Sequence, residues 1–576
     1  MSAGTLRGFY DALTREEKRV GAMFEDDAFG LVMRVAINEL DLELEGAHRG
    51  GALPTEDDRE RGYVMRLGVN RIIKLALSAH PRFLAPTWTI PRDLDLSAEV
   101  LSFVMQLGTI DHGRRIAQSL SSKGGRIEAA AGGFGITLPH SVIDHELHER
   151  ELDDRNRERG RQRFEKGPQA FVDDQIGREV RELLTELVYP YAGRFIGYES
   201  DPKLDVYFFG RAYNELQLSR GYDAFHFATR FGGMTFLHFK LAATFVLQAA
   251  NRHRAFVRAL LEKELHVRIE DILTVSGDTD NFRESMRDFI NYFGEGIEGH
   301  VPVDDDGVRI LFDVLSIGRR NRDLLDRPGA PIPPLVQCSD RHVIKVLSGA
   351  GTDIMQFLLN SLQQSFPRDY DAAQREREGV MQRGIESMLR DALPSLEFRA
   401  NIKLRQRGKV LTDLDLVAID AARGRAVLFQ LKHQDHYGDD LATMQARTAR
   451  LNKQVGDWLG KVRGWLALAS AAELRSVLRL PAASSPIAVT LMVVTRHFAS
   501  SLRGIVGNTD AAFANWTQFA TAVARMRVES ETASLDRLIQ LSRSLSEAED
   551  ESHLSEPSAV YRVGELLFKI ESELEA

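Results

Sequence analysis

The sequence predicts a multidomain protein in which a mainly α-helical N-terminal region precedes a C-terminal α/β domain. Its 576 residues, 43% hydrophobic and 27% charged, are enough for two to four globular domains. Apolar residues recur every three or four positions through most of the first 370 residues, which is the period of an amphipathic helix. From about residue 375, alternating and continuous apolar runs typical of β-strands replace that period.

The N-terminal region shows its helical period in "GREVRELLTELVYPYAG", "ATFVLQAANRHRAFVRALLEKEL" and "DVLSIGRRNRDLLDR". Residues 144–166 alternate both signs of charge and predict a solvated helix or connector. The proline-containing stretch "SFPRDYDAAQ" (365–374) is the best boundary before the C-terminal domain. We therefore divide the chain into a helical N-terminal region at 1–165, a second mainly helical region at 166–370 and a C-terminal domain with its helices at 371–576.

The C-terminal domain begins with a predicted helix in "REGVMQRGIESMLRDAL", which Pro394 stops. A strand with alternating apolar and polar residues comes next, and two further strands joined by a turn at "AARGR" come after it. A long helix and a continuously apolar strand complete the pattern. The predicted order is α-β-β-β-α-β. The ranges of its elements after the first helix are 396–409, 413–420, 426–433, 441–466 and 487–497.

Four polar residues interrupt two of these apolar strands. Asp413 and Asp415 lie in one run, and Gln430 and Lys432 lie in the next. Because residues two apart share a face of a strand, pairing of the two runs would bring the carboxylates and the amine together at one end of the sheet. Burying such groups without partners costs several kcal/mol each, so the cluster must be mutually paired, hydrated or bound to a metal. Metal chemistry accounts for the residue types best, and an edge hairpin with solvent-facing charges is the plain alternative.

These motifs resemble the PD-(D/E)XK nuclease superfamily, the restriction-endonuclease-like fold, over roughly residues 375–500. Glu386 in the first helix matches the helix acid, Asp415 the metal-binding Asp, and Gln430-Leu431-Lys432 the D/E-x-K element. Gln430 stands where an acid is expected, which is similar to the Gln-x-Lys type of restriction nucleases that act on modified DNA. Leu414-Asp415 also stands where the resemblance would place Pro-Asp, a position at which that superfamily is loose.

The resemblance implies hydrolysis of a phosphodiester with Mg²⁺ or Mn²⁺ as cofactor. Asp415, Glu386 and Gln430 would hold the metal, with the carbonyl of Leu431 completing its shell. Lys432 would orient or deprotonate the attacking water or neutralise the phosphate. Asp413 and, on the following helix, Gln454 are expected as supporting residues.

Local charge favours nucleic acid as the partner, DNA over RNA. Residues 399–463 contain thirteen Lys and Arg against seven Asp, a net charge of +6 in a chain of net charge −9 and pI near 6.0. We expect four of these cations to align on one face as a path for phosphates: Lys403, Arg405, Arg407 and Lys409. Lys453 is expected to add to it from the next helix. A strand face kept soluble by its charge is the alternative interpretation.

The remaining features define the setting. The single cysteine, Cys338, excludes an intramolecular disulfide, and the N-terminus lacks the layout of a secretory signal. We expect a soluble cytoplasmic protein without a membrane partner. Since no motor motif is present, the helical region would sense, recognise or assemble, and analogy with the superfamily points to bacterial anti-phage defence or restriction.

Two other functions stay open. Gln430 is also what a catalytically inactive nuclease fold would carry, which would leave a nucleic-acid-binding scaffold. The C-terminal sheet could instead be a docking platform of a protein-interaction module. Homo-oligomerisation and a partner protein are left open as well.

Overall fold

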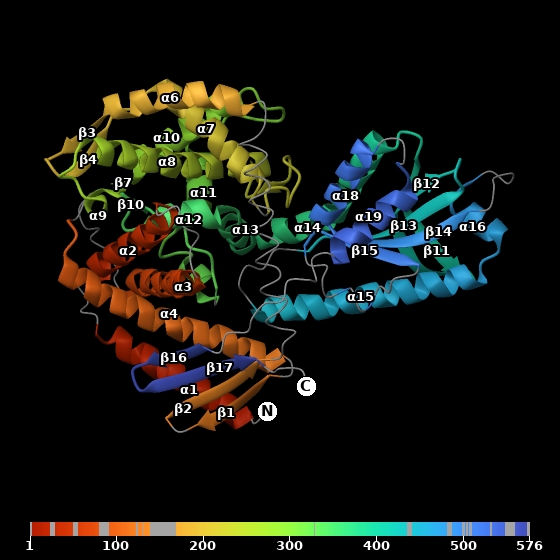
Figure 1. The fold of residues 1–576 in the computed structure, drawn as a ribbon, viewed down its shortest axis with the longest axis horizontal. Coiled ribbons are helices and arrows are strands. Elements are labelled where there is room, and N and C mark those ends of the chain that lie inside the picture. Colours follow the sequence, from red (N-terminus) through yellow and green to blue (C-terminus); the bar gives the residue numbers. More distant parts are fainter. Residues whose placement is uncertain are drawn as a thin grey trace.

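The computed structural model describes residues 3–23, 29–49, 56–79, 91–122, 125–130, 132–138, 169–219, 221–327, 329–434, 441–480, 487–497, 502, 505, 510–529, 533–547 and 559–572. The protein has two lobes (Figure 1). The N-terminal lobe contains the elements from α1 to α13 together with the last hairpin of the chain, and the C-terminal lobe contains those from α14 to α19. Helices and mixed sheets thus occur together, as expected for a multidomain protein with an α/β C-terminal part.

The first layer of the N-terminal lobe consists of helices packed on a small mixed sheet. The strand order is β1-β2-β17-β16, so the last hairpin of the chain completes a sheet begun near residue 126. Phe9 lies edge-on to Phe134 and Phe568, which joins the first helix to both halves of the sheet. The elements of this layer are α1 (Ala3–Gly21), α2 (Phe29–Arg49), α3 (Glu56–Ala79), α4 (Leu94–Ser122), β1 (Arg126–Ala130), β2 (Gly133–Leu138), β16 (Ala559–Val563) and β17 (Leu566–Ser572).

The second layer surrounds the long buried helix α8. The first half of this helix, residues 236–250, is buried on every face, as expected of a helix inside a core. A four-stranded sheet, β7-β10-β9-β8, and two short hairpins accompany the helices. The elements are α6 (Gln169–Leu187), β3 (Val188–Tyr191), β4 (Phe195–Tyr198), α7 (Pro202–Gln217), β5 (Arg230–Phe231), β6 (Met234–Thr235), α8 (Phe236–Lys263), α9 (Ile269–Ile272), β7 (Ser276–Asp278), α10 (Thr279–Gly294), α11 (Asp305–Leu315), β8 (Ser316–Ile317), η1 (Arg322–Asp326), β9 (Leu335–Gln337), β10 (His342–Lys345), α12 (Leu347–Thr352) and α13 (Ile354–Ser365).

The C-terminal lobe contains the predicted α-β-β-β-α-β order, with additional elements after it. Its sheet has the order β11-β12-β13-β14-β15, in which the first three strands are antiparallel neighbours and β13, β14 and β15 are parallel. The parallel step from β13 to β14 requires a crossover, which α15 and α16 supply. The elements are α14 (Pro367–Ala392), β11 (Glu397–Gln406), β12 (Lys409–Asp420), β13 (Arg425–Lys432), α15 (Leu441–Leu468), α16 (Ala471–Val477), β14 (Ala488–Thr495), β15 (Ala511–Asn515), α18 (Trp516–Val528) and α19 (Leu535–Glu547).

Both faces of this sheet are covered, as the apolar strands predicted. Phe429 and Leu431 pack toward α14, α18 and α19, whereas Leu428 packs toward α15 with Val455 and Trp458. Alternate residues of β13 therefore enter opposite cores, and burying Phe429 alone contributes about 2–3 kcal/mol.

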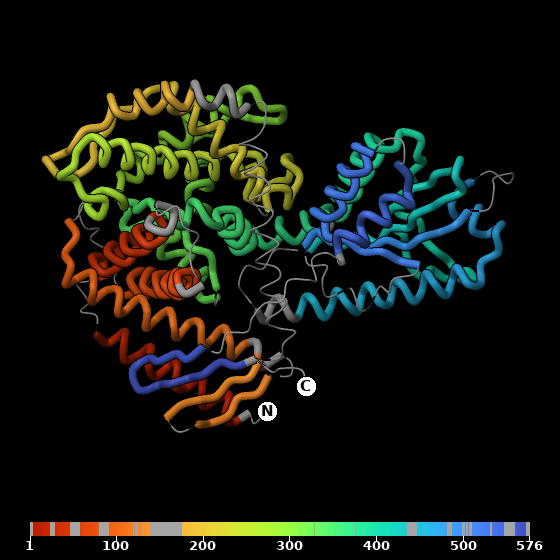
Figure 2. Tube along the Cα trace, in the orientation of Figure 1, coloured from red at the N-terminus to blue at the C-terminus, as the bar shows by residue number. Residues whose placement is uncertain are grey.

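Helix α14 joins the two lobes (Figure 2). Its first turns place Tyr370 and Ala373 in the core of the N-terminal lobe, and its later turns place Ile385 and Leu389 in the core of the C-terminal lobe. It starts at Pro367, in the position where proline begins a helix without losing a hydrogen bond. The predicted boundary at 365–374 thus corresponds to the start of a shared helix.

The last hairpin departs from our division of the chain. We placed 371–576 in one C-terminal domain, yet β17 pairs in parallel with β2 from Leu567 opposite Gly133 to Ser572 opposite Leu138. The predicted boundary at 165 and the charged segment 144–166 lie outside the described residues.

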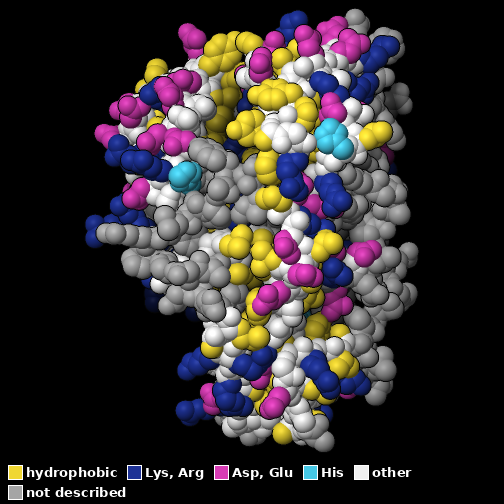
Figure 3. Space-filling model, turned by 90° about the vertical axis from the view of Figure 1, so that its left-hand side faces the viewer, with side chains coloured by type: hydrophobic (Ala, Val, Ile, Leu, Met, Phe, Trp, Pro, Cys, Tyr) yellow, Lys and Arg dark blue, Asp and Glu magenta, His cyan; other side chains and the backbone are white. Residues whose placement is uncertain are grey.

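The surface of the N-terminal lobe opposite the C-terminal lobe carries mixed charge. Figure 3 shows Lys and Arg side chains interspersed with Asp and Glu over the described part of this face. Among the helices described, none is both long and apolar enough to cross a membrane.

Candidate functional site

Asp415 occupies the point where β12 and β13 separate. The ladder between these strands runs from Asp420 opposite Arg425 to Leu416 opposite Phe429, and Asp415 is the next residue of β12 beyond that last pair. Beyond that point, the Asp415 side chain makes the connection: its Oδ2 accepts hydrogen bonds from Gln430 Nε2 at 2.5 Å and from the Leu431 backbone N–H at 2.6 Å. Since a carboxylate can only accept, the amide nitrogen of Gln430 is the atom that faces it.

Burial makes Asp415 costly to ionise. Burial, together with the smaller effects of the nearby Glu378 and Asp413 carboxylates, raises the pKa of Asp415 to about 6. The Leu431 N–H and the Lys432 ammonium oppose this rise without cancelling it. A partly desolvated carboxylate beside other carboxylates favours a bound cation.

Lys432 ends β13 next to a helix acid, but that acid is not the one we predicted. Its Nζ lies 3.5 Å from Oε1 of Glu378 on α14. Glu386 instead accepts a hydrogen bond from Arg390 Nη2 at 2.6 Å, one turn further along its own helix. The structure therefore brings Glu378, and not Glu386, to the Asp415–Gln430–Lys432 cluster.

The helix geometry explains this correction. Glu386 follows Glu378 by eight residues, which corresponds to about 12 Å along the axis and roughly 80° around it. The sequence pattern identified the helix and its buried face but not which turn lies beside the strand ends. Glu378 already lies in the first turn of the predicted helix, so what the sequence lacked was a signal for which acid of that helix faces the strand ends.

The four expected cations of the first hairpin do not share one face. Arg407 and Gly408 both have positive φ, 50° and 81°, which forms a tight two-residue turn of the type that matches strand twist. This turn places Lys409 opposite Gln406, whereas Lys403 and Arg405 lie on the other face of β11. All four side chains are exposed, so they form a basic hairpin tip with cations on both sides.

The remaining predicted residues, Asp413, Lys453 and Gln454, have exposed side chains. Asp413 is exposed, and its backbone carbonyl accepts a hydrogen bond from Trp458 Nε1 at 2.9 Å. Lys453 pairs with Asp457 at 3.1 Å on the outer face of α15, and Gln454 is exposed beside it. The structure thus supports neither Lys453 nor Gln454 as part of the Asp415 cluster.

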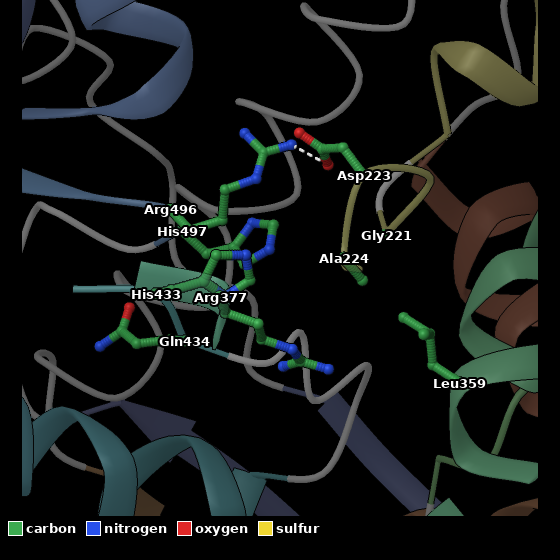
Figure 4. A pocket seen from close by; sticks show the side chains of 9 residues that line it. All are labelled: Gly221, Asp223, Ala224, Leu359, Arg377, His433, Gln434, Arg496 and His497. Carbon is green, nitrogen blue, oxygen red and sulfur yellow. Dashed lines mark hydrogen bonds and ion pairs between the residues drawn. The ribbon is translucent and has the colours of Figure 1, made fainter. Parts of the chain in front are cut away.

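A pocket that sequence reasoning missed lies beside the cluster, between the two lobes (Figure 4). Arg377 of α14, His433 after β13 and Arg496 after β14 line it from the C-terminal lobe, and Asp223 lines it from the N-terminal lobe. Burial, followed by the charges of both arginines, lowers the pKa of His433 to about 3. No local signal marks these residues, because they are distant in the sequence and meet only through the packing of the lobes.

The donor set fits Mg²⁺ or Mn²⁺ through oxygen ligands. Among the described residues, no group of three or more His, Cys, Asp and Glu side chains could hold a metal ion. Asp415 and Glu378 both place a carboxylate near the Lys432 ammonium. Mg²⁺ is commonly held by one or two carboxylates together with water and substrate phosphates, so this pair satisfies its requirement.

Comparisons with known proteins add no family to this picture. The chain matches no protein-family model, no curated protein and no solved structure. The interpretation of the site therefore depends on its own geometry.

Proposed function

We propose that this protein is a metal-dependent nuclease that hydrolyses phosphodiester bonds of nucleic acid at the Asp415 cluster. One observation carries the proposal: the partly buried Asp415 carboxylate on β12 accepts hydrogen bonds from Gln430 and Leu431 on β13, next to Lys432 and its helix acid Glu378. An isolated structural carboxylate would not need a second carboxylate and an amine beside it.

The arrangement of elements supports the same proposal. The order α-β-β-β-α-β, with Asp415 on the second strand and Gln430 and Lys432 on the third, resembles the restriction-endonuclease-like fold. The helix acid also comes from the first helix of that order. We propose a PD-(D/E)XK-type domain whose second acidic position is Gln430.

Each residue has a role that its contacts permit. Asp415 and Glu378 would hold Mg²⁺ or Mn²⁺, which when bound activates water and neutralises charge on the phosphate. Gln430 and the Leu431 N–H fix the Asp415 carboxylate, leaving its Oδ1 outside these two hydrogen bonds. Lys432 places an ammonium beside both carboxylates, where it can bind a phosphate oxygen or orient the attacking water.

The basic hairpin tip provides contacts to the substrate backbone. Lys403, Arg405, Arg407 and Lys409 are exposed on the lobe that contains Asp415, while the N-terminal lobe carries mixed charge on the face seen in Figure 3. We propose DNA in preference to RNA as substrate, and the N-terminal lobe as a recognition or assembly module, with anti-phage defence or restriction as the setting.

The test is cleavage under metal control. Purified protein is incubated with supercoiled plasmid, linear duplex DNA and RNA in Mg²⁺, Mn²⁺ or EDTA, beside Asp415→Asn and Lys432→Met. We expect metal-dependent cleavage that each substitution reduces by at least about 100-fold. Asp457→Asn, which removes an exposed carboxylate of α15, should retain full activity. Cleavage in EDTA, or equal cleavage by Asp415→Asn, would refute the assignment.

A second candidate function is an inactive scaffold that binds nucleic acid. Gln430 supports this function, because its amide donates a hydrogen bond to Asp415 at the position where a second carboxylate would help to hold a metal. In that case the protein binds DNA with equal affinity in EDTA and in Mg²⁺, cleaves nothing, and Asp415→Asn leaves the affinity unchanged.

A further inference from the structure

The pocket between the lobes adjoins the proposed nuclease site through backbone contacts. The Arg496 N–H donates a hydrogen bond to the Lys432 carbonyl at 2.8 Å, and His433 directly follows Lys432. Arg377 directly precedes Glu378 on α14. The pocket therefore lies at the carboxyl ends of β13 and β14, where parallel strands commonly present ligand-binding groups.

Two arginines line this pocket, and the guanidinium group of each lies over aromatic rings. Arg377 is 3% exposed and stacks over Phe225 at 4.0 Å and Tyr370 at 5.1 Å from the ring centroids. Arg496 lies 5.3 Å from the ring centroid of Trp516. Stacked guanidiniums are preorganised for planar, two-pronged binding of an oxyanion, and the partly apolar surroundings strengthen such binding.

One carboxylate already occupies an oxyanion position in the pocket. Asp223, in the loop after α7, forms an ion pair and hydrogen bond with Arg496 Nη2 across the lobe boundary (Figure 4). Burial raises the pKa of Asp223, but the charge and hydrogen bond of Arg496 outweigh this effect and lower it overall. Asp223 is thus an anion supplied by one lobe to an arginine of the other.

We infer that this pocket is a phosphate-binding subsite for the nucleic-acid strand entering the Asp415 cluster, and that Asp223 holds the phosphate position until the strand displaces it. The substrate class rests on the proposed function. Arg496 exchanges a carboxylate for a phosphate, and Arg377 and His433 line the position that the phosphate reaches. Binding of the strand therefore breaks the Asp223–Arg496 contact between the lobes.

The inference predicts effects of opposite sign for the two partners of one ion pair. Asp223→Asn removes the competing anion and should increase affinity for nucleic acid about fivefold. Arg496→Gln removes a phosphate contact, should weaken affinity at least about tenfold, and should lower the slope of log Kd against log salt by about one. If the pair only stabilises the fold, both substitutions lower thermal stability and neither increases affinity.

The experiment measures fluorescence anisotropy of a labelled 30-base-pair DNA duplex, a DNA single strand and an RNA single strand in EDTA, from 50 to 200 mM salt. Two matched controls remove equal charges from ion pairs within one lobe: Asp205→Asn, paired with Arg252, and Arg463→Gln, paired with Asp510. Both should change affinity less than threefold. Thermal unfolding of all four variants identifies any loss of folding.

The outcomes separate this inference from the nuclease proposal. Weaker or unchanged binding by Asp223→Asn overturns the subsite, as does a wild-type protein that binds none of the three probes. Opposite effects of the two substitutions without any metal-dependent cleavage support the subsite and refute the nuclease. Cleavage without opposite effects supports the nuclease and refutes the subsite.

Discussion

Replacing Gln430 by Glu should make the stability of the protein depend on a bound metal ion. In the protein, Gln430 Nε2 donates to Asp415 Oδ2 at 2.5 Å. The substitution replaces the Gln430 amide by a second carboxylate beside that of Asp415. Two carboxylate charges about 4 Å apart repel by about 4 kcal/mol at an effective dielectric constant near 20. Because the pKa of Asp415 is already about 6, the pair will share one proton at neutral pH.

The cost of that shared proton sets the expected loss of stability. In the unfolded chain, the introduced Glu side chain loses this proton with an ordinary pKa near 4.3. Because the folded protein must keep the proton at pH 7.5, its free energy of unfolding falls by about 4 kcal/mol. The sign follows from a raised folded-state pKa of an acid: the loss is complete above that pKa and disappears as the pH falls toward 4. Mg²⁺ or Mn²⁺ replaces the proton, so the metal should restore much of the lost free energy.

Urea unfolding followed by tryptophan fluorescence measures this change in the relevant lobe. Three of the four tryptophans, Trp458, Trp465 and Trp516, lie in the C-terminal lobe, and Trp88 lies outside the described residues. Gln406→Glu, at the exposed end of β11, makes the same substitution without a buried neighbour and is the control. A Gln430→Glu protein that unfolds like the wild type at pH 7.5 and ignores both metals would refute the site described here.

Three further predictions test other parts of the reasoning. Glu378→Gln should reduce metal-dependent cleavage at least about 30-fold, whereas Glu386→Gln, about 12 Å along the helix, should change it less than threefold; the reverse order would restore the original assignment. Burial raises the pKa of Asp415 to about 6, so calorimetric titration with Mn²⁺ should show affinity falling about tenfold per pH unit below 6 and constant above 7; a pH-independent affinity would exclude this ligand. Burial also raises the pKa of Asp111 to about 6, against the lowering charges of Arg71 and Arg114. Asp111→Asn should therefore raise the free energy of unfolding by about 3 kcal/mol at pH 8 and by almost nothing at pH 4, and equal effects at both pH values would contradict this.

The sequence predicted the C-terminal lobe well because its signals are local. Alternation along β11, the continuous apolar run of β13, the proline after α14 and the turn at "AARGR" between β12 and β13 each act within a few residues. Asp413 and Asp415 were therefore assigned to the correct strand, and so were Gln430 and Lys432. Their fine geometry was less accessible: a two-residue turn split the basic hairpin, and a strand pattern alone does not show which cations share a face.

Features that depend on distant parts of the chain were not predictable. The pairing of β17 with β2 joins residues more than 400 positions apart, and the short strands involved resemble many others. The contact between Asp223 and Arg496 spans 273 positions and connects two loops. Such contacts are decided by how whole layers pack, and a single sequence contains no periodic signal for them.

The choice between Glu378 and Glu386 follows from the same helix that joins the lobes. Tyr370 is held in the N-terminal core and Ile385 in the C-terminal core, and Arg377 and Glu378 lie on the turns between them. An α-helix is stiff over this length, so the position of one lobe relative to the other fixes where Glu378 meets Lys432 and where Arg377 enters the pocket. The N-terminal lobe thus determines the geometry of the site without contributing a residue to the Asp415 cluster, and a displacement of that lobe would alter the helix acid and the adjoining pocket together.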